Sequence, residues 1–301
     1  MIRTTRFSAA VLSLVLAAAA CNNDQLNRPF VDTPVDPLFD RYVSMGNSLT
    51  AGFQSGGIND STQNQSYAVL LAHAMGSPFF SPLMNKPGCP PPYTNVFTQT
   101  RLSGGTSTTC ALRKNQSPPP PFISNTAVPG AEVMDVFNNL DTASNANTLT
   151  QFFLGGLTQA QMMERAHPTF VSVWIGNNDV LGAAINSTNG GDSTKITSVA
   201  NFQARYAALL DTVEAAGPRG GILIGVGNVT GIPFFSRGST YLGAKLAGQL
   251  PPALTVTANC APPRGDSVLV PFPFGAALVG AAAAGSPQTL DCTEIQTVQP
   301  A

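Results

Sequence analysis

Histidine is scarce in this chain, with two residues in 301, and that number excludes a histidine-rich metal site. Charge is scarce too: Lys, Arg, Asp and Glu together make up 10% of the residues, against about 25% in typical soluble domains. The net charge of −1 leaves no positive excess to neutralise phosphates, which excludes a basic nucleic-acid-binding protein. The hydrophobic content of 43% argues against disorder, and the length is sufficient for a substantial core.

The first 21 residues resemble a secretion signal. Arg3 and Arg6 precede an apolar run over residues 9–20, which is shorter than the roughly 20 residues that a membrane span requires. The run ends in Ala-Ala-Ala-Cys21, which resembles a bacterial lipobox with Ala18 in the place where Leu is usual. An ordinary secretory signal with a chance cysteine is the alternative. We favour the first interpretation, which predicts an exported cell-envelope lipoprotein, periplasmic or outer-surface, anchored to the membrane through a lipid on Cys21.

The other four cysteines fit an exported protein. Cys89, Cys110, Cys260 and Cys292 form an even set, which outside the cytosol suggests disulfides. We expect local pairing, Cys89 with Cys110 and Cys260 with Cys292, because both pairs lie in Pro- and Gly-rich stretches. No Cys-x-x-Cys or Cys/His spacing indicates a metal site.

Strand and helix patterns alternate through the middle of the chain. Apolar runs predict strands over 42–45, 123–128, 170–175 and 221–226, and helical patterns cover 67–75, 131–140, 157–166 and 199–216. This alternation predicts an α/β fold with a parallel central sheet. The expected divisions are a signal peptide (1–21), a tether (22–38), an α/β domain (39–230) and an insertion or cap (231–301). The Pro-rich segment 76–122 is expected to hold little regular structure.

Three residues follow predicted strands at the edge where parallel sheets carry their sites. Ser48 follows the first strand, Gly130 the second and Asn178 the third. A serine hydroxyl can attack a carbonyl, and an amide side chain or a turn N–H can donate to the resulting oxyanion. Each residue also has an ordinary role in a turn or a helix cap, which is the favoured interpretation for any one of them alone.

Taken together, the three segments resemble the SGNH hydrolases, also called the GDSL esterase/lipase family. Residues 46–52 (Gly-Asn-Ser-Leu-Thr-Ala-Gly) resemble the first block of that family, with Asn47 where Asp is commonest. Residues 126–131 resemble the second block, and residues 174–179 match the third, written GxND. The three blocks occur in order, each after a predicted strand, from about residue 41 to about residue 229.

The resemblance implies both a fold and a reaction. The fold is a flavodoxin-like three-layer α/β/α sandwich with a parallel central sheet. The reaction is hydrolysis of a small-molecule or lipid ester without a cofactor or a metal. Ser48 would be the nucleophile, and the oxyanion hole would consist of the Ser48 N–H, the Gly130 N–H and the Asn178 side chain. Asp179 would hold the turn of the third block.

The catalytic base of the family is the element that this sequence lacks. The family's base is a histidine in a late Asp-x-x-His block, but no histidine follows Val229. His167 precedes the strand at 170–175 and is expected at the opposite sheet edge, and His73 lies on a helix that runs away from the site. Either the chain is cut short at its C-terminus, which we favour, or it is a lipid-anchored binding or structural module without full catalysis.

The sequence does not identify the substrate. Loops form the pocket walls in this fold, here the segments 76–122 and 231–301. Four phenylalanines could line an acyl pocket or belong to the core, which we favour: Phe234, Phe235, Phe272 and Phe274.

Overall fold

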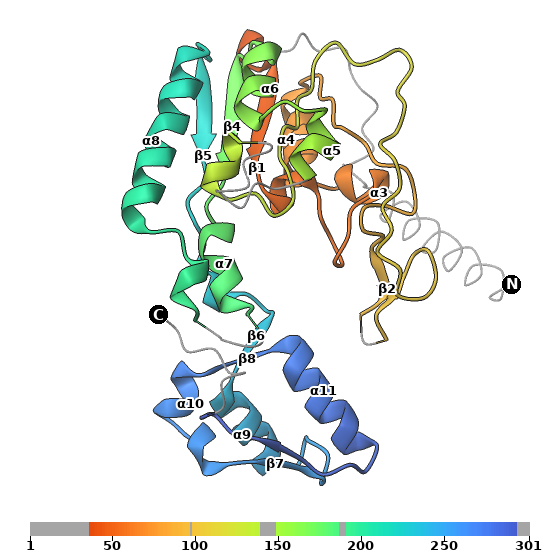
Figure 1. The fold of residues 1–301 in the computed structure, drawn as a ribbon, viewed down its shortest axis with the longest axis vertical. Helices are drawn as coiled ribbons and strands as arrows, with labels where there is room; N and C mark the ends of the chain where they lie inside the picture. The colour runs from red at the N-terminus through yellow and green to blue at the C-terminus, as the bar shows by residue number, and fades with distance from the viewer. Residues whose placement is uncertain (1–35, 97, 139–148, 187–190, 294–301) are drawn as a thin grey trace, which may run out of the picture. The chain divides into compact units, whose positions relative to one another are not determined.

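The computed structural model describes residues 36–96, 98–138, 149–186 and 191–293 (Figure 1). The predicted signal peptide, Cys21 and residues 22–35 of the predicted tether lie outside these ranges. Among the described helices, none combines the length and the apolar character that crossing a membrane requires.

The central sheet has three parallel strands in the order β1-β4-β5. These strands are β1 (Tyr42–Gly46), β4 (Phe170–Trp174) and β5 (Gly220–Leu223). β1 and β4 pair in register from their first residue to their last, so their carboxyl ends meet at one edge of the sheet. β5 pairs with β4 in the same way, starting opposite Phe170. Three of the four predicted strands are therefore confirmed, and β5 ends a few residues earlier than expected.

The fourth predicted strand, over 123–128, lies beside β1 but is not a continuous strand. The backbone N–H of Ser44 donates to Ser124 (2.8 Å), and the N–H groups of Thr126 and Val128 donate to Ser44 (2.9 Å) and Gly46 (3.1 Å). Only one ladder bridge forms, at Asn125. The Asn125 side chain accepts from the N–H of Ala127 at 3.2 Å, and such a local bond competes with strand pairing. The segment still follows β1 toward the same sheet edge.

Helices cover both faces of the sheet. Tyr42 and Phe170 point to one face, where they pack with residues of α4 (Tyr67–Met75). Their neighbours Val43 and Val171 point to the other face, because side chains alternate along a strand, and they share a core with α6 (Gln159–Ala166) and α8 (Val199–Ala215). All three helices agree with the predicted ranges within two residues.

Side-chain caps explain where these helices begin. The hydroxyl groups of Ser66, Thr158 and Ser198 accept hydrogen bonds from the first turns of α4, α6 and α8.

The prediction of an α-helix over 131–140 is wrong. Within the described residues the segment forms a single 3₁₀ turn, η3 (Val133–Val136), held by the side chains of Glu132 and Asp135.

The remaining elements before residue 232 are short. The structure gives η2 (Pro37–Phe39), α2 (Ser48–Ala51), α3 (Asp60–Gln63), β2 (Tyr93–Asn95), β3 (Thr100–Arg101), α5 (Leu149–Leu154), α7 (Asn178–Ala184), η5 (Ser193–Lys195) and η6 (Val229–Gly231). In the described part of 76–122 the regular elements are β2 and β3, as the prolines predict.

The chain after residue 231 has its own small sheets and its own core. Its elements are β6 (Phe235–Arg237), α9 (Gly238–Leu246), β7 (Leu254–Val256), η7 (Ala258–Cys260), α10 (Arg264–Ser267), β8 (Leu269–Pro271), α11 (Phe272–Ala283) and β9 (Gln288–Leu290). β6 pairs with β8 and β7 pairs with β9, and none of the described strands here joins the β1-β4-β5 sheet. β5 is therefore an edge strand within the described residues, with Ile222 40% and Leu223 56% exposed.

Both expected disulfides are present. Cys89 bonds Cys110, and Cys260 bonds Cys292. The first links parts of the Pro-rich segment, and the second belongs to the core of the C-terminal elements. Disulfides persist in oxidising environments, so the pair indicates an extracellular or otherwise oxidising compartment.

Candidate functional site

The three segments singled out in the sequence come together at the carboxyl edge of the sheet. Ser48 is the first residue of α2, just past β1, and Asn178 is the first residue of α7, just past β4. Gly130 follows the 124–128 segment on the other side of β1. The side-chain Nδ2 of Asn178 donates a hydrogen bond to the carbonyl of Ala131 at 2.8 Å, which joins the third segment to the second.

The turn after β1 presents Ser48. The side chain of Asn47 caps α2 by accepting from the N–H of Leu49 at 3.1 Å, and Gly52 ends the helix in a left-handed conformation. Ser48 is half-buried, and its hydroxyl and N–H make no hydrogen bond to another described residue. The serine is thus held by its neighbours while its own donors stay available.

A buried glutamine fixes the start of this turn. Gln159 of α6 accepts from the Gly46 N–H at 2.9 Å and donates to the Gly46 carbonyl at 3.0 Å. Gly46 has a φ of 155°, and a Cβ there would lie 2.5 Å from the Trp174 carbonyl, so only glycine fits. Sequence analysis missed Gln159, whose only signal is a polar residue on the apolar side of a helix.

Two further contacts hold α2 against its surroundings. The hydroxyl groups of Thr50 and Tyr67 lie 3.1 Å apart, and Asn125 donates to the Thr50 carbonyl at 2.9 Å. Tyr67 also packs edge-to-face against Trp174, with 5.3 Å between the ring centres. The first residue of α4 therefore lies at the same end of the sheet as Ser48.

Three carboxyl groups lie beside the second and third segments. Asp179 accepts from the N–H of Val133 at 2.9 Å, which supports the turn-holding role expected for it. Its other oxygen is buried without a hydrogen-bond partner, and burial raises the pKa of this carboxyl group. Burial also raises the pKa of Glu132 to about 7, helped by the negative charges of Asp179 and Asp135 and opposed by Lys195.

Both histidines lie away from this edge. His167 is the C-cap of α6, three residues before β4, and so it lies at the amino end of the strands. His73 lies in the last turn of α4. Its neighbour Ala72 packs against Tyr42, the first residue of β1. The helix runs from the Ser48 end of the sheet to the opposite end, which agrees with the sequence argument against His73 as the base.

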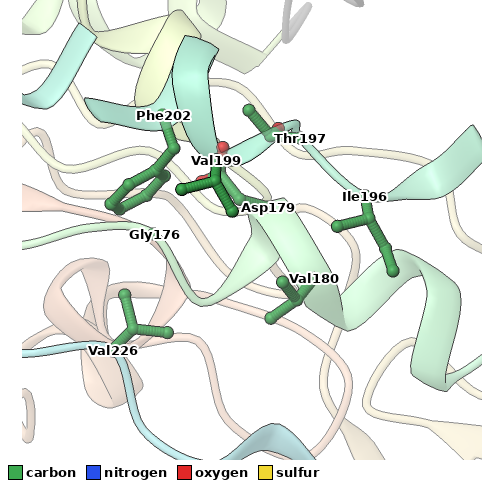
Figure 2. A pocket seen from close by; sticks show the side chains of 8 residues that line it. All are labelled: Gly176, Asp179, Val180, Ile196, Thr197, Val199, Phe202 and Val226. Atoms are coloured by element: carbon green, nitrogen blue, oxygen red, sulfur yellow. The ribbon is translucent and has the colours of Figure 1, made fainter. Parts of the chain in front are cut away.

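A mainly apolar pocket of about 220 Å³ is lined by Gly176 and Asp179, which flank Asn178 in the sequence, together with residues of later segments (Figure 2). Its apolar lining consists of Gly176, Val180, Ile196, Val199, Phe202 and Val226, with Asp179 and Thr197 completing the wall. None of the four phenylalanines considered from the sequence lines it. Phe235 is buried, and Phe234 and Phe274 pack against the core clusters, as the favoured interpretation expected. That interpretation is wrong for Phe272, which is 36% exposed at the start of α11.

The chain therefore places a serine, a glycine and an asparagine at the carboxyl edge of a parallel α/β sheet, which is the edge where such sheets carry their sites. The family model described as GDSL-like lipase/acylhydrolase matches residues 42–269, and the chain belongs to this family. The match begins where the resemblance was expected to begin and extends past residue 229. Family membership implies an ester hydrolase and an ester substrate. Searches of curated proteins and of solved structures found no match.

Proposed function

We propose that this chain is an SGNH-type esterase or lipase that hydrolyses carboxylic esters on a flavodoxin-like three-layer scaffold, with Ser48 as the nucleophile. The observation that carries the proposal is the meeting of the three segments at one sheet edge, joined by the hydrogen bond from Asn178 to Ala131. The free donors of Ser48 add support, because a reacting carbonyl oxygen needs unused N–H groups.

The proposed chemistry follows from these positions. The Ser48 Oγ bonds to the ester carbonyl carbon, and the oxygen becomes an oxyanion. The N–H groups of Ser48 and Gly130 and the Asn178 amide donate to it. An asparagine amide has two N–H bonds, so Asn178 keeps one for the oxyanion while the other holds Ala131. The C–O bond to the alcohol then breaks, the alcohol leaves with a proton, and water hydrolyses the acyl-serine.

No histidine takes the serine proton in this scheme. Neither His73 nor His167 lies at the carboxyl edge, so we expect slow turnover. An oxyanion hole alone retains part of the rate enhancement when a triad member is missing. The positions of both histidines also favour a second candidate, a non-catalytic binding or structural module on the same scaffold.

We further propose that the protein is exported and lipid-anchored through Cys21. The disulfides support an oxidising location, and the lipobox-like sequence before Cys21 supports the anchor. Mass spectrometry of the protein from a bacterial membrane fraction tests this. A diacylglyceryl group on Cys21 supports the anchor, and an unmodified cysteine or cleavage at another site contradicts it.

A serine-directed fluorophosphonate probe tests the nucleophile. We expect covalent labelling of the wild-type chain, none of Ser48→Ala, and full labelling of Ser103→Ala, an exposed serine far from the site in sequence. Equal labelling of the wild-type chain and Ser48→Ala would refute Ser48 as the nucleophile of a hydrolase. The non-catalytic binding module would then be the remaining candidate. Fast p-nitrophenyl ester turnover that depends on Ser48 shows that the argument from the missing base is wrong.

A further inference from the structure

The pocket includes the turn that carries Asn178, because Gly176 and Asp179 on either side of this residue in the sequence line it. Gly176, two residues before Asn178, has a φ of 109°. A Cβ at this position would lie 2.6 Å from a methyl carbon of Val226 and 2.9 Å from the Phe202 ring. Figure 2 shows Phe202 and Val226 on either side of Gly176. The glycine thus lets two apolar side chains close over the turn, so the pocket wall and the candidate oxyanion donor share one short segment.

The pocket wall has the character of a site for an alkyl chain. Its side chains come from α7, α8, the turn before α8 and the chain after β5, and most are apolar. Val199 is 73% exposed and Val226 is 45% exposed, which is unusual for valine and leaves apolar surface open beside a polar site. The lining residues include no Lys, Arg or His, so a carboxylate on the ligand would lose its hydration there without gaining a positive partner.

The volume sets the size of the occupant. A cavity of about 150 Å³ lined by apolar residues holds benzene, which has six carbon atoms. By that measure the pocket of about 220 Å³ accepts an unbranched chain of roughly six to eight carbon atoms. We propose that this pocket binds a neutral, medium-length alkyl chain of the ester substrate while Asn178 engages its carbonyl. The inference rests on the proposed ester hydrolysis for the identity of the ligand.

Binding to the Ser48→Ala chain tests the pocket without turnover. Full burial of a methylene changes a binding constant about fourfold, and for a pocket open on one side we expect about twofold. Calorimetry or ligand-observed NMR should then show 1-octanol binding about 16-fold more tightly than 1-butanol. Octanoate at pH 8 should bind more weakly than 1-octanol, because no basic residue lines the pocket to pair with its carboxylate. Equal binding of the two alcohols, or tighter binding of octanoate, overturns the proposal.

A matched pair of tryptophan variants locates the binding. Val199→Trp, at the exposed first residue of α8, fills the mouth of the pocket. Ala207→Trp, also exposed on α8 but outside the lining, is the control. Each variant is made in the Ser48→Ala chain, and its folding is checked by circular dichroism. We expect Val199→Trp to lower the affinity for 1-octanol at least tenfold and Ala207→Trp to leave that affinity unchanged. Equal effects of the two variants refute the assignment.

Two esters identify which half of the substrate supplies the chain. Methyl octanoate carries the chain on the acyl side and octyl acetate carries it on the alcohol side. Tighter binding of one ester to Ser48→Ala assigns the pocket to that half, and equal binding assigns it to a chain from either side. If no ester is hydrolysed by the wild-type chain while 1-octanol binding depends on Val199, the proposed hydrolysis fails and the alkyl pocket stands.

Discussion

Glu132→Gln should make the protein more stable at alkaline pH and leave it unchanged at acid pH. The pKa of Glu132 is raised from its ordinary 4.5 to about 7 by burial and by the neighbouring charges of Asp179 and Asp135. A raised pKa means that the folded chain holds the proton more tightly than the unfolded chain. Stability therefore falls as the pH rises from about 4.5 to about 7, and the full penalty remains above that window.

The size of the effect follows from the same values. The difference between 4.5 and about 7 corresponds to an upper limit of about 3 kcal/mol. Glu132 is half-buried, so solvent screens its charge and we expect about 1 kcal/mol. Glutamine keeps the side-chain oxygen that caps η3 and removes the charge.

Urea denaturation at one-unit steps from pH 4 to pH 8 measures this effect. The stability difference between Glu132→Gln and wild type should be close to zero at pH 4 and grow to about 1 kcal/mol at pH 8. Glu164→Gln, an exposed glutamate on α6, should show no such trend. A difference that stays constant across this range, or that shrinks as the pH rises, would refute the placement of Glu132 among carboxyl groups.

Three other perturbations have expected outcomes. Gln159→Leu should lower the free energy of unfolding by about 2–3 kcal/mol in urea, because two buried backbone groups lose their partner, and should slow fluorophosphonate labelling. Gly176→Ala should cost more stability than Gly248→Ala, by about 1–2 kcal/mol, since both have positive φ but only the first would collide with neighbours. Replacing Cys89 and Cys110 by serine should lower the free energy of unfolding by about 3 kcal/mol, because the disulfide closes a loop with a sequence separation of 21 residues. A lower melting temperature would report this loss.

Hydrophobic periodicity predicted most strands and helices of the α/β domain, because local sequence determines where many of them begin and end. The run at 170–175 is apolar because β4 is covered on both faces, and the helix at 67–75 is flanked by its own cap residues, Ser66 and Gly76. The form of the segment at 123–128 was harder to predict, because the Asn125 side chain makes hydrogen bonds to Ala127 and Thr50. The local bond to Ala127 competes with strand pairing. The helix expected over 131–140 became a 3₁₀ turn tied to the Asp179 side chain.

Part of the candidate site could be predicted from the sequence and part could not. The order of three short motifs predicted that Ser48, Gly130 and Asn178 follow their strands. Gln159 and the pocket depend on contacts between elements far apart in the chain, and no local pattern contains such contacts. The four phenylalanines were candidates for the wall because they are large and apolar, but its apolar side chains are those of three valines, Ile196 and one other phenylalanine, Phe202.

The position of Trp174 has a practical consequence. It is the single tryptophan of the chain, it ends β4, and its ring packs against Tyr67 at the Ser48 end of the sheet. Intrinsic fluorescence excited at the tryptophan band therefore arises wholly from the edge that carries the candidate site. Emission from this one indole reports on the surroundings of the active edge without any added label.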